Sequence, residues 1–261
     1  MNFENLRYEL EDGLARLTRA RPPRNTINPA TVRELLQAAI RLDEDERVRA
    51  ELISAEGQTF SVGGDLREFV GAGEELPTLL KELTVYLHAA VSWLVRSQAP
   101  VVCAVGGPVA GGRLSLVLAS DLVLAAEGAT FSYGYSKIGF SPDGSSTYFL
   151  PRLLGARRAT EFALMGRTLS AEKALEWGLV NRVVADGELN DAASTLEVEL
   201  AEGPTASFAA AKSLLHRSWT ETLETPMELE ARVLSDTACT ADVEEGMEAF
   251  LKKRRARFTG R

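Results

Sequence analysis

The chain has 261 residues, of which 45% are apolar and 25% charged, and its formal net charge is −8. This composition is typical of a globular protein with an ample core and excludes a largely disordered chain. The negative charge argues against nucleic acid or an anionic membrane as the main partner. The run Lys252-Lys253-Arg254-Arg255 is a local basic cluster that suits a phosphorylated ligand.

Cysteine usage and the N-terminus bear on the compartment. Cys103 and Cys239 lack CxxC spacing, so we expect reduced structural thiols, no disulfide and no metal site. The first residues carry no signal-peptide pattern, and no apolar run approaches the roughly 18 residues that span a bilayer. We therefore expect a cytoplasmic protein with no membrane partner.

Hydrophobic periodicity and turn residues predict the elements in chain order. The N-terminal half is expected to contain a hairpin of strands 6–11 and 14–20 around Asp12-Gly13, then helix 29–47, strand 50–55, a short helix beginning at Asp65, helix 78–97, strand 101–105 and helix 114–119. The rest is expected to contain strands 121–126 and 130–133, helical segments over 146–177, strand 180–184, and helices 189–201, 205–218, 227–238 and 243–255.

This order of elements predicts an α/β fold in which strands and helices segregate along the chain. We expect residues 1–185 to form the core that binds the substrate. Residues 186–261 are expected to form a helical C-terminal region that covers the core, closes the pocket or meets another subunit.

Two glycine-bearing turns are the most informative feature of the sequence. Ser61-Val62-Gly63-Gly64-Asp65 and Ala110-Gly111-Gly112-Arg113 lie about fifty positions apart, each after an apolar run and before a predicted helix. Alone, either turn is a common close-packing device. Together they predict an oxyanion hole, because a backbone N–H from each turn can point at one carbonyl oxygen and stabilise an enolate.

The sequence resembles the crotonase, or enoyl-CoA hydratase/isomerase, superfamily over nearly its whole length. The motifs that carry the resemblance are Arg21-Pro22, residues 57–65, residues 104–112, Asp121, residues 150–155, residues 171–184, and residues 246–250 with Lys253-Arg254. The resemblance implies a spiral of ββα repeats with a C-terminal helical extension, and a homotrimer or dimer of trimers. It also implies an acyl-CoA substrate, with coenzyme A as part of that substrate and no further cofactor.

The resemblance also implies roles for individual residues. The N–H groups of Gly64 and Gly112 match the family's two oxyanion donors. The positions that match the CoA path are Arg24, Ser61, Val62 and Asp65, with Lys253 and Phe258 arriving from a neighbouring subunit's terminal helix. Hydratases of the family use two glutamates, but this chain has Ser115 and Tyr135 at those positions. Neither hydroxyl is a good base near neutral pH.

Asp143 is the remaining carboxylate in the matching stretch. In the family's ring-type and dienoyl-CoA isomerases, an aspartate at this point moves a proton between carbons of the acyl chain. Residues 136–184 are most similar to the phenylacetate-pathway isomerases, so we expect an acyl-CoA isomerase that shifts a double bond or rearranges a ring. Burial among Phe140, Phe149 and Tyr135 is expected to raise the pKa of Asp143.

Other interpretations remain open at this point. Asp143 can act as a nucleophile, as in the family's aryl-CoA dehalogenases, or serve only as a turn or cap residue. The chain can be a hydratase with an unusual arrangement around Asp143 and Tyr135, or a non-catalytic acyl-CoA binding protein. A hydrolase built from Ser115, a histidine and Asp143 lacks the G-x-S-x-G motif. His88 and His216 are expected in ordinary structural surroundings. Arg113 stands where the family has a third glycine. Its side chain either suits a substrate with a polar or anionic group near the oxyanion hole or faces outward.

Overall fold

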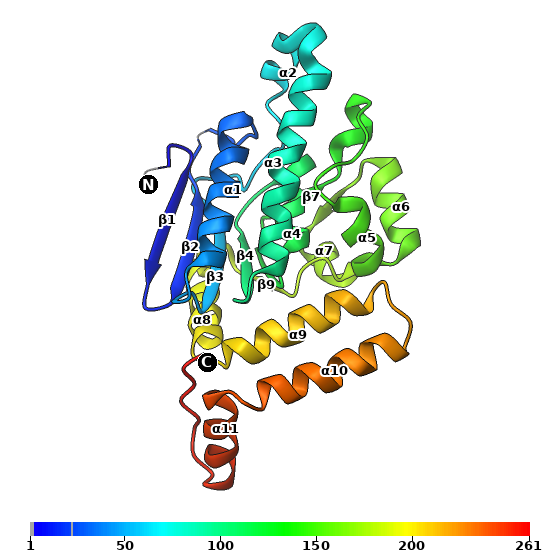
Figure 1. Cartoon of the computed structure of the whole chain (residues 1–261). Helices are drawn as coiled ribbons and strands as arrows, with labels where there is room; N and C mark the ends of the chain where they lie inside the picture. Colours follow the sequence, from blue (N-terminus) through cyan, green and yellow to red (C-terminus); the bar gives the residue numbers. More distant parts are fainter. Residues whose placement is uncertain (1–2, 22) are drawn as a thin grey trace.

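The computed structural model describes residues 3–21 and 23–261, so Pro22 of the Arg21-Pro22 motif lies outside the described residues. A six-stranded sheet with the order β1-β2-β3-β4-β6-β9 forms the centre, and β5, β7 and β8 form a second sheet (Figure 1). The strands are β1 Leu6–Glu11, β2 Leu14–Arg19, β3 Ala50–Ala55, β4 Val101–Val105, β5 Val109–Ala110, β6 Leu122–Ala126, β7 Thr130–Ser132, β8 Thr168–Ser170 and β9 Arg182–Val184. The helices are α1 Pro29–Glu44, α2 Leu66–Ala72, α3 Leu76–Arg96, α4 Leu114–Ala119, α5 Ser146–Leu154, α6 Ala156–Met165, α7 Ala171–Trp177, α8 Leu189–Ala201, α9 Thr205–Ser218, α10 Glu224–Thr237 and α11 Ala241–Leu251. Four 3-10 turns complete them, η1 Gly73–Glu75, η2 Gly111–Arg113, η3 Gly134–Ile138 and η4 Asp186–Glu188.

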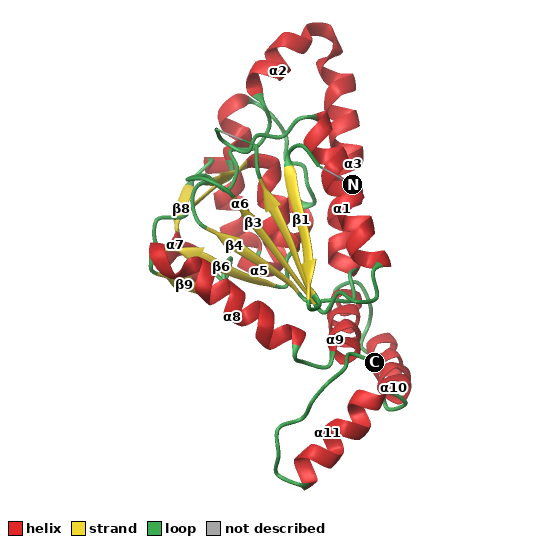
Figure 2. Cartoon of the chain, turned by 90° about the vertical axis from the view of Figure 1, so that its left-hand side faces the viewer, coloured by secondary structure: helices red, strands yellow, loops and turns green. Residues whose placement is uncertain are grey.

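The central sheet is covered on both faces. Among the described residues, the predicted hairpin β1–β2 is the only antiparallel pair within it, and β2, β3, β4, β6 and β9 pair in parallel. In β4, Val101 and Cys103 belong to the core with α1 and α3, whereas Val102 and Ala104 pack with α8 on the opposite face. Figure 2 shows the sheet between these two helical layers. A parallel strand with two covered faces needs apolar residues at every position, which explains the run at 101–105.

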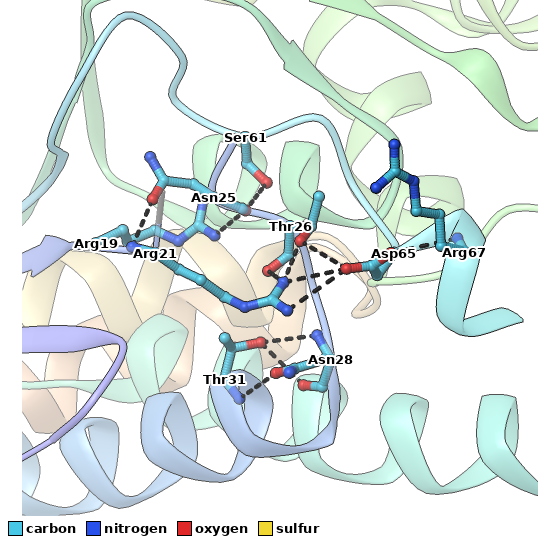
Figure 3. Close-up of polar contacts among 9 residues, drawn as sticks. All are labelled: Arg19, Arg21, Asn25, Thr26, Asn28, Thr31, Ser61, Asp65 and Arg67. Atoms are coloured by element: carbon cyan, nitrogen blue, oxygen red, sulfur yellow. Dashed lines mark hydrogen bonds and ion pairs between the residues drawn. The ribbon is translucent and has the colours of Figure 1, made fainter. Parts of the chain in front are cut away.

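Local side-chain contacts set the limits of α1. Asn28 Oδ1 accepts from the Thr31 N–H at 2.9 Å, and Thr31 Oγ1 accepts from the Asn28 N–H at 2.9 Å, which is a capping box (Figure 3). The helix ends at Glu44, short of the predicted Arg47. Asp45 has left the helical conformation, and its carboxylate accepts from the Arg47 N–H at 3.1 Å and from the Arg47 guanidinium.

Two short strands and the ends of several further elements also differ from the predictions. The expected helical stretch 146–177 is interrupted by β8, which pairs antiparallel with β7, and β5 was not predicted either. Strands of two or three residues are too short to show a period, so pairing in the folded chain decides them. The predicted helix 243–255 ends at Leu251, because the chain then folds back and the Asp242 carboxylate accepts from the Thr259 and Gly260 N–H groups.

The C-terminal helices differ in what they contact. Helix α8 covers the second face of the sheet, and α9 is fastened to the core by Lys212, whose ammonium lies 2.6 Å from Asp121 Oδ2 and donates to the Ala99 carbonyl at 2.8 Å. Helices α10 and α11 extend away from the sheet (Figure 1) and leave large apolar side chains exposed, among them Leu234 and Phe250. The division at residue 185 stays a prediction. Within the described residues, no helix has the length and apolar character that a membrane crossing requires.

Candidate active site

The fold brings the two glycine turns into contact. They follow β3 and β4, which are parallel neighbours in the sheet. The Ser61 N–H donates to the Pro108 carbonyl at 3.1 Å, and the Ala110 N–H donates to the Ser61 carbonyl at 2.8 Å. Gly63 has a φ of +87°, and a Cβ built on it would lie 3.0 Å from the Ala110 carbonyl oxygen. The two turns therefore lie in contact, as an oxyanion hole built from both requires, and the hole itself stays a prediction.

The amides expected to form the oxyanion hole lie in these turns. In the described part of the chain, the Gly64 N–H donates to no protein acceptor. Gly112 is the second residue of η2, and the first N–H groups of such a turn have no partner within it. A Cβ on Gly64 would lie 2.4 Å from the Phe69 ring. Close packing around Gly64 leaves no room for a side chain, and its N–H is available to a ligand.

Asp143 lies directly against the second turn. A Cβ on Gly112 would lie 2.9 Å from Asp143 Oδ1 and 3.3 Å from Oδ2. The next residue, Gly144, has a φ of +62° and lies so close to the Ser115 side chain that a Cβ would be 2.6 Å from Ser115 Cβ. Ser146 Oγ donates to the Asp143 carbonyl at 2.7 Å. These contacts hold the Asp143 carboxylate beside the predicted oxyanion donor of Gly112.

The Asp143 carboxylate is hydrogen-bonded by Tyr135, whose hydroxyl donates to Oδ1. Burial raises the pKa of Asp143, as expected from the sequence, while the Tyr135 hydrogen bond and the attraction of His88 and Arg113 oppose that rise. Burial and the neighbouring carboxylate also raise the pKa of Tyr135. Tyr135 therefore remains a neutral donor and is not a base near neutral pH.

The aromatic surroundings differ in part from the expectation. Phe140 lies 6.2 Å from Phe69, measured between ring centroids, and so belongs to the side of the site near Gly64. Phe149 packs instead against Tyr148 at 5.1 Å and Trp219 at 6.2 Å, which ties α5 to the end of α9.

Ser115 and Arg113 flank the second turn. Ser115 is buried, and its hydroxyl donates to the Gly112 carbonyl, so it supports the turn. Arg113 is 0% exposed, which makes the alternative that it faces outward wrong. None of its side-chain nitrogens has a hydrogen-bond partner in the described chain. Burial lowers the pKa of Arg113 to about 9, so the guanidinium is still cationic at neutral pH.

The residues expected along the CoA path hold the first turn together (Figure 3). The Ser61 side chain is buried, and its hydroxyl donates to the Asn25 carbonyl at 2.6 Å. Asp65 caps α2 through the Arg67 N–H at 3.2 Å and pairs with Arg21 at 3.4 Å. The Val62 N–H donates to the Arg24 carbonyl at 3.4 Å, which leaves the exposed Arg24 side chain beside the turn.

Lys253 and Phe258 lie at the far end of the same chain. Lys253 is exposed just after α11, and the Phe258 ring packs against α11 at Gly246. Both views place α11 opposite α2, so these residues do not contribute to the site of their own chain (Figures 1 and 2). Their expected role in a neighbouring subunit stays a prediction.

His88 is a site residue that sequence reasoning missed. It lies on α3, and its Nε2 accepts from the Gly144 N–H at 3.0 Å, next to Asp143. An acceptor Nε2 requires the tautomer that carries its proton on Nδ1. A single histidine in an amphipathic helix gives no signal of this position, because the contact joins residues 56 positions apart.

A parallel sheet that brings two glycine turns together, with a carboxylate against the second turn, is the arrangement expected of a crotonase-type enzyme. The chain matches the sequence profile of the enoyl-CoA hydratase/isomerase family over residues 9–261 and belongs to this family. Its fold matches a crystal structure of a putative enoyl-CoA hydratase/isomerase from Mycobacterium abscessus with a TM-score of 0.94 and 35% identity, over 98% of this chain and all of the other. The predicted α/β crotonase fold with C-terminal helices is thereby confirmed.

Curated relatives carry several activities. The chain is 37% identical to a probable enoyl-CoA hydratase of Rhodobacter capsulatus over 100% of both chains. It is 36% identical to the 1,2-epoxyphenylacetyl-CoA isomerase of Escherichia coli over 99% of this chain and 100% of the relative. It is also 35% identical to a 4-chlorobenzoyl coenzyme A dehalogenase of Arthrobacter over 87% of this chain and 83% of the relative. The family is therefore shown, and the reaction within it has to be argued from the site.

Proposed function

We propose that this protein is an acyl-CoA isomerase that moves a double bond, or rearranges a ring, in the acyl part of a CoA thioester. Asp143 takes a proton from one carbon of the acyl group, and the electron pair of the broken C–H bond shifts to the thioester oxygen. The N–H groups of Gly64 and Gly112 stabilise this oxygen, each by about 3–4 kcal/mol. Asp143 then returns the proton to another carbon. The reaction uses no cofactor besides the coenzyme A of the substrate.

The contact between Asp143 and Gly112 is the observation that carries this proposal. A virtual Cβ on Gly112 lies 2.9 Å from Asp143 Oδ1. The base thus lies beside the residue that carries one expected donor of the oxyanion hole, and such closeness supports proton transfer next to a thioester carbonyl. Tyr135 donates to this carboxylate and supports the ionised form that accepts a proton.

Hydration is supported less well by the same residues. The two-carboxylate route of the family's hydratases needs acids where this chain has Ser115 and Tyr135. The Ser115 hydroxyl donates to the Gly112 carbonyl, and the Tyr135 hydroxyl donates to Asp143. Neither is arranged to take a proton from water, so a hydratase would have to use Asp143 alone.

Covalent catalysis is the second candidate, because His88 lies beside Asp143 and a base next to a nucleophile is the usual arrangement for it. In this reaction the Asp143 carboxylate attacks a ring carbon of a haloaryl-CoA thioester, the carbon–halogen bond breaks with release of halide, and water hydrolyses the resulting aspartyl ester. The dehalogenase relatives make this candidate worth testing. Proton shuttling is preferred, because the lone pair of His88 Nε2 already accepts the Gly144 N–H.

The decisive experiment compares the wild type with Asp143→Asn on a panel of β,γ-unsaturated and α,β-unsaturated acyl-CoA thioesters. We expect the variant to lose roughly 10²–10⁴-fold in double-bond migration, the usual contribution of a general base. Incorporation of deuterium from D₂O into the acyl chain follows the proton step directly. Full migration by Asp143→Asn would overturn the proposal.

Two further readouts separate the alternatives. Single turnover in H₂¹⁸O that labels the Asp143 carboxylate would indicate nucleophilic catalysis, and formation of a 3-hydroxyacyl-CoA would indicate hydration. Tight CoA binding without any turnover across the panel would indicate a binding protein. We also propose that the active form is a homotrimer or a dimer of trimers, in which Lys253 and Phe258 of one subunit complete the CoA site of another.

A further inference from the structure

Arg113 is a buried cation without a partner. It is 0% exposed, and Nε, Nη1 and Nη2 have no acceptor in the part of the chain that the structure describes. Arg19 is buried to a similar degree, but it donates to the carbonyl groups of Phe60, at 2.7 Å, and Asn25. An uncompensated buried charge opposes folding, so Arg113 calls for a reason other than stability.

The charges around Arg113 indicate that reason. Arg113 directly follows Gly112, whose Cα lies against the Asp143 carboxylate. Asp143 is the carboxylate that attracts Arg113, and the neighbouring cations Arg19 and Arg21 repel it. Asp143 is therefore the acidic group that attracts this guanidinium, although no hydrogen bond joins the two.

The other groups that face Asp143 come from three elements. Tyr135 on η3 donates to the carboxylate, and His88 on α3 accepts the N–H of the next residue, Gly144. Tyr133 directly follows β7, and burial and the charge of Asp143 raise its pKa. A charged His88 would attract the carboxylate more strongly than Arg113 does, but His88 is exposed to solvent and is uncharged when its Nε2 accepts the Gly144 N–H. Arg113 is sealed from solvent, and its field acts with little screening.

We propose that Arg113 is a positioning residue that holds Asp143 in its ionised, proton-accepting form and then favours negative charge on the thioester oxygen at Gly112. The inference rests on the proposed proton transfer. As the proton moves from carbon to Asp143, the negative charge leaves the carboxylate and appears on the oxygen at the Gly112 N–H. Both places lie at Gly112, the residue that Arg113 directly follows, so the buried cation favours the negative charge before and after the step and makes no bond to the substrate.

The test compares Arg113→Met, which removes the charge at similar length, with Arg113→Lys, which keeps it. Each is measured by the pH profile of kcat/KM for double-bond migration and by the thermal midpoint. We expect the acid limb of Arg113→Met to move up by roughly one pH unit, with kcat lowered about tenfold at neutral pH. Arg113→Lys is expected to keep the wild-type limb. The midpoint of Arg113→Met should equal or exceed that of the wild type, which a merely structural arginine would not give.

An unmoved acid limb in Arg113→Met would overturn the inference, and so would an equal shift in Arg113→Lys. Arg113→Gln replaces the methionine variant if that one does not fold, and failure of both neutral variants to fold would assign Arg113 to structure and also overturn it. Asp143→Asn separates the proposed isomerase function from the proposed role of Arg113. If Asp143→Asn retains activity, the isomerase proposal fails. If Asp143→Asn is inactive but Arg113→Met keeps the wild-type pH profile, only the proposed role of Arg113 fails.

Discussion

Replacing Tyr135 by phenylalanine removes one hydroxyl and tests whether Asp143 is the base. Burial raises the pKa of Asp143. The Tyr135 hydroxyl donates to Asp143 Oδ1, stabilises the ionised carboxylate and so lowers that pKa. A hydrogen bond to a charged group contributes about 1.5–3 kcal/mol. Since one pKa unit corresponds to about 1.4 kcal/mol, Tyr135→Phe is expected to raise the pKa of Asp143 by about one to two units.

The assay is the pH dependence of kcat/KM for double-bond migration in an unsaturated acyl-CoA. The acid limb of Tyr135→Phe should move up by about one to two pH units, because the carboxylate then protonates at higher pH. The plateau above the limb should fall less than about tenfold, since the base and both amides are still present. Tyr133→Phe is the matched control, because the Tyr133 hydroxyl pairs with Ser146 Oγ at 2.9 Å and not with the carboxylate.

Two results would refute this reasoning. An acid limb that stays at the wild-type pH would show that Asp143 is not the group that titrates in the reaction. Loss of the whole plateau would show that Tyr135 itself transfers the proton. An equal shift in Tyr133→Phe would assign the effect to general packing of the two rings, whose centroids lie 5.0 Å apart.

Three further predictions concern other parts of the chain. Gly112→Ala places a Cβ 2.9 Å from Asp143 Oδ1 and should lower kcat about 100-fold. The control Gly71→Ala places its Cβ in open space and should leave kcat unchanged. A wild-type kcat for Gly112→Ala would contradict the proposed site. Burial raises the pKa of Glu51 from 4.5 to about 7 in the folded protein. The stability that protonated Glu51 contributes is therefore fully present below pH 4.5, the pKa in the unfolded chain, and is lost as the pH rises through 7. Glu51→Gln should therefore be more stable than the wild type at about pH 8, by up to roughly 3 kcal/mol in urea unfolding, and similar at about pH 4.5; equal stability at the higher pH contradicts the shift. Lys253→Met should raise the KM for the CoA thioester about fivefold without changing kcat, with Lys252→Met, which loses an ion pair to Glu248, as control; an unchanged KM contradicts a shared site.

The amino-acid sequence was sufficient for the parts of the fold that depend on local pattern. The hairpin around Asp12-Gly13, the apolar run of β4 and the amphipathic pattern of α3 each specify their element through turn chemistry or periodicity. The short strands β5 and β8 carry no such pattern, because their pairing partners lie elsewhere in the chain. Some helix ends differ by a few residues from the predicted ones, because a side chain such as that of Asp45 hydrogen-bonds the backbone directly after the helix.

The candidate site divides in the same way. The sequence by itself determined the family, because its motif spacing is specific. It also predicted the two glycine turns and Asp143 as the site, since close backbone approach demands glycine. Only the tertiary structure decided that Asp143 lies against Gly112, that His88 from α3 reaches Gly144, and that Arg113 is buried without a partner. Charge, burial and proton affinity depend on neighbours brought together from distant segments, and a linear pattern does not contain those distances.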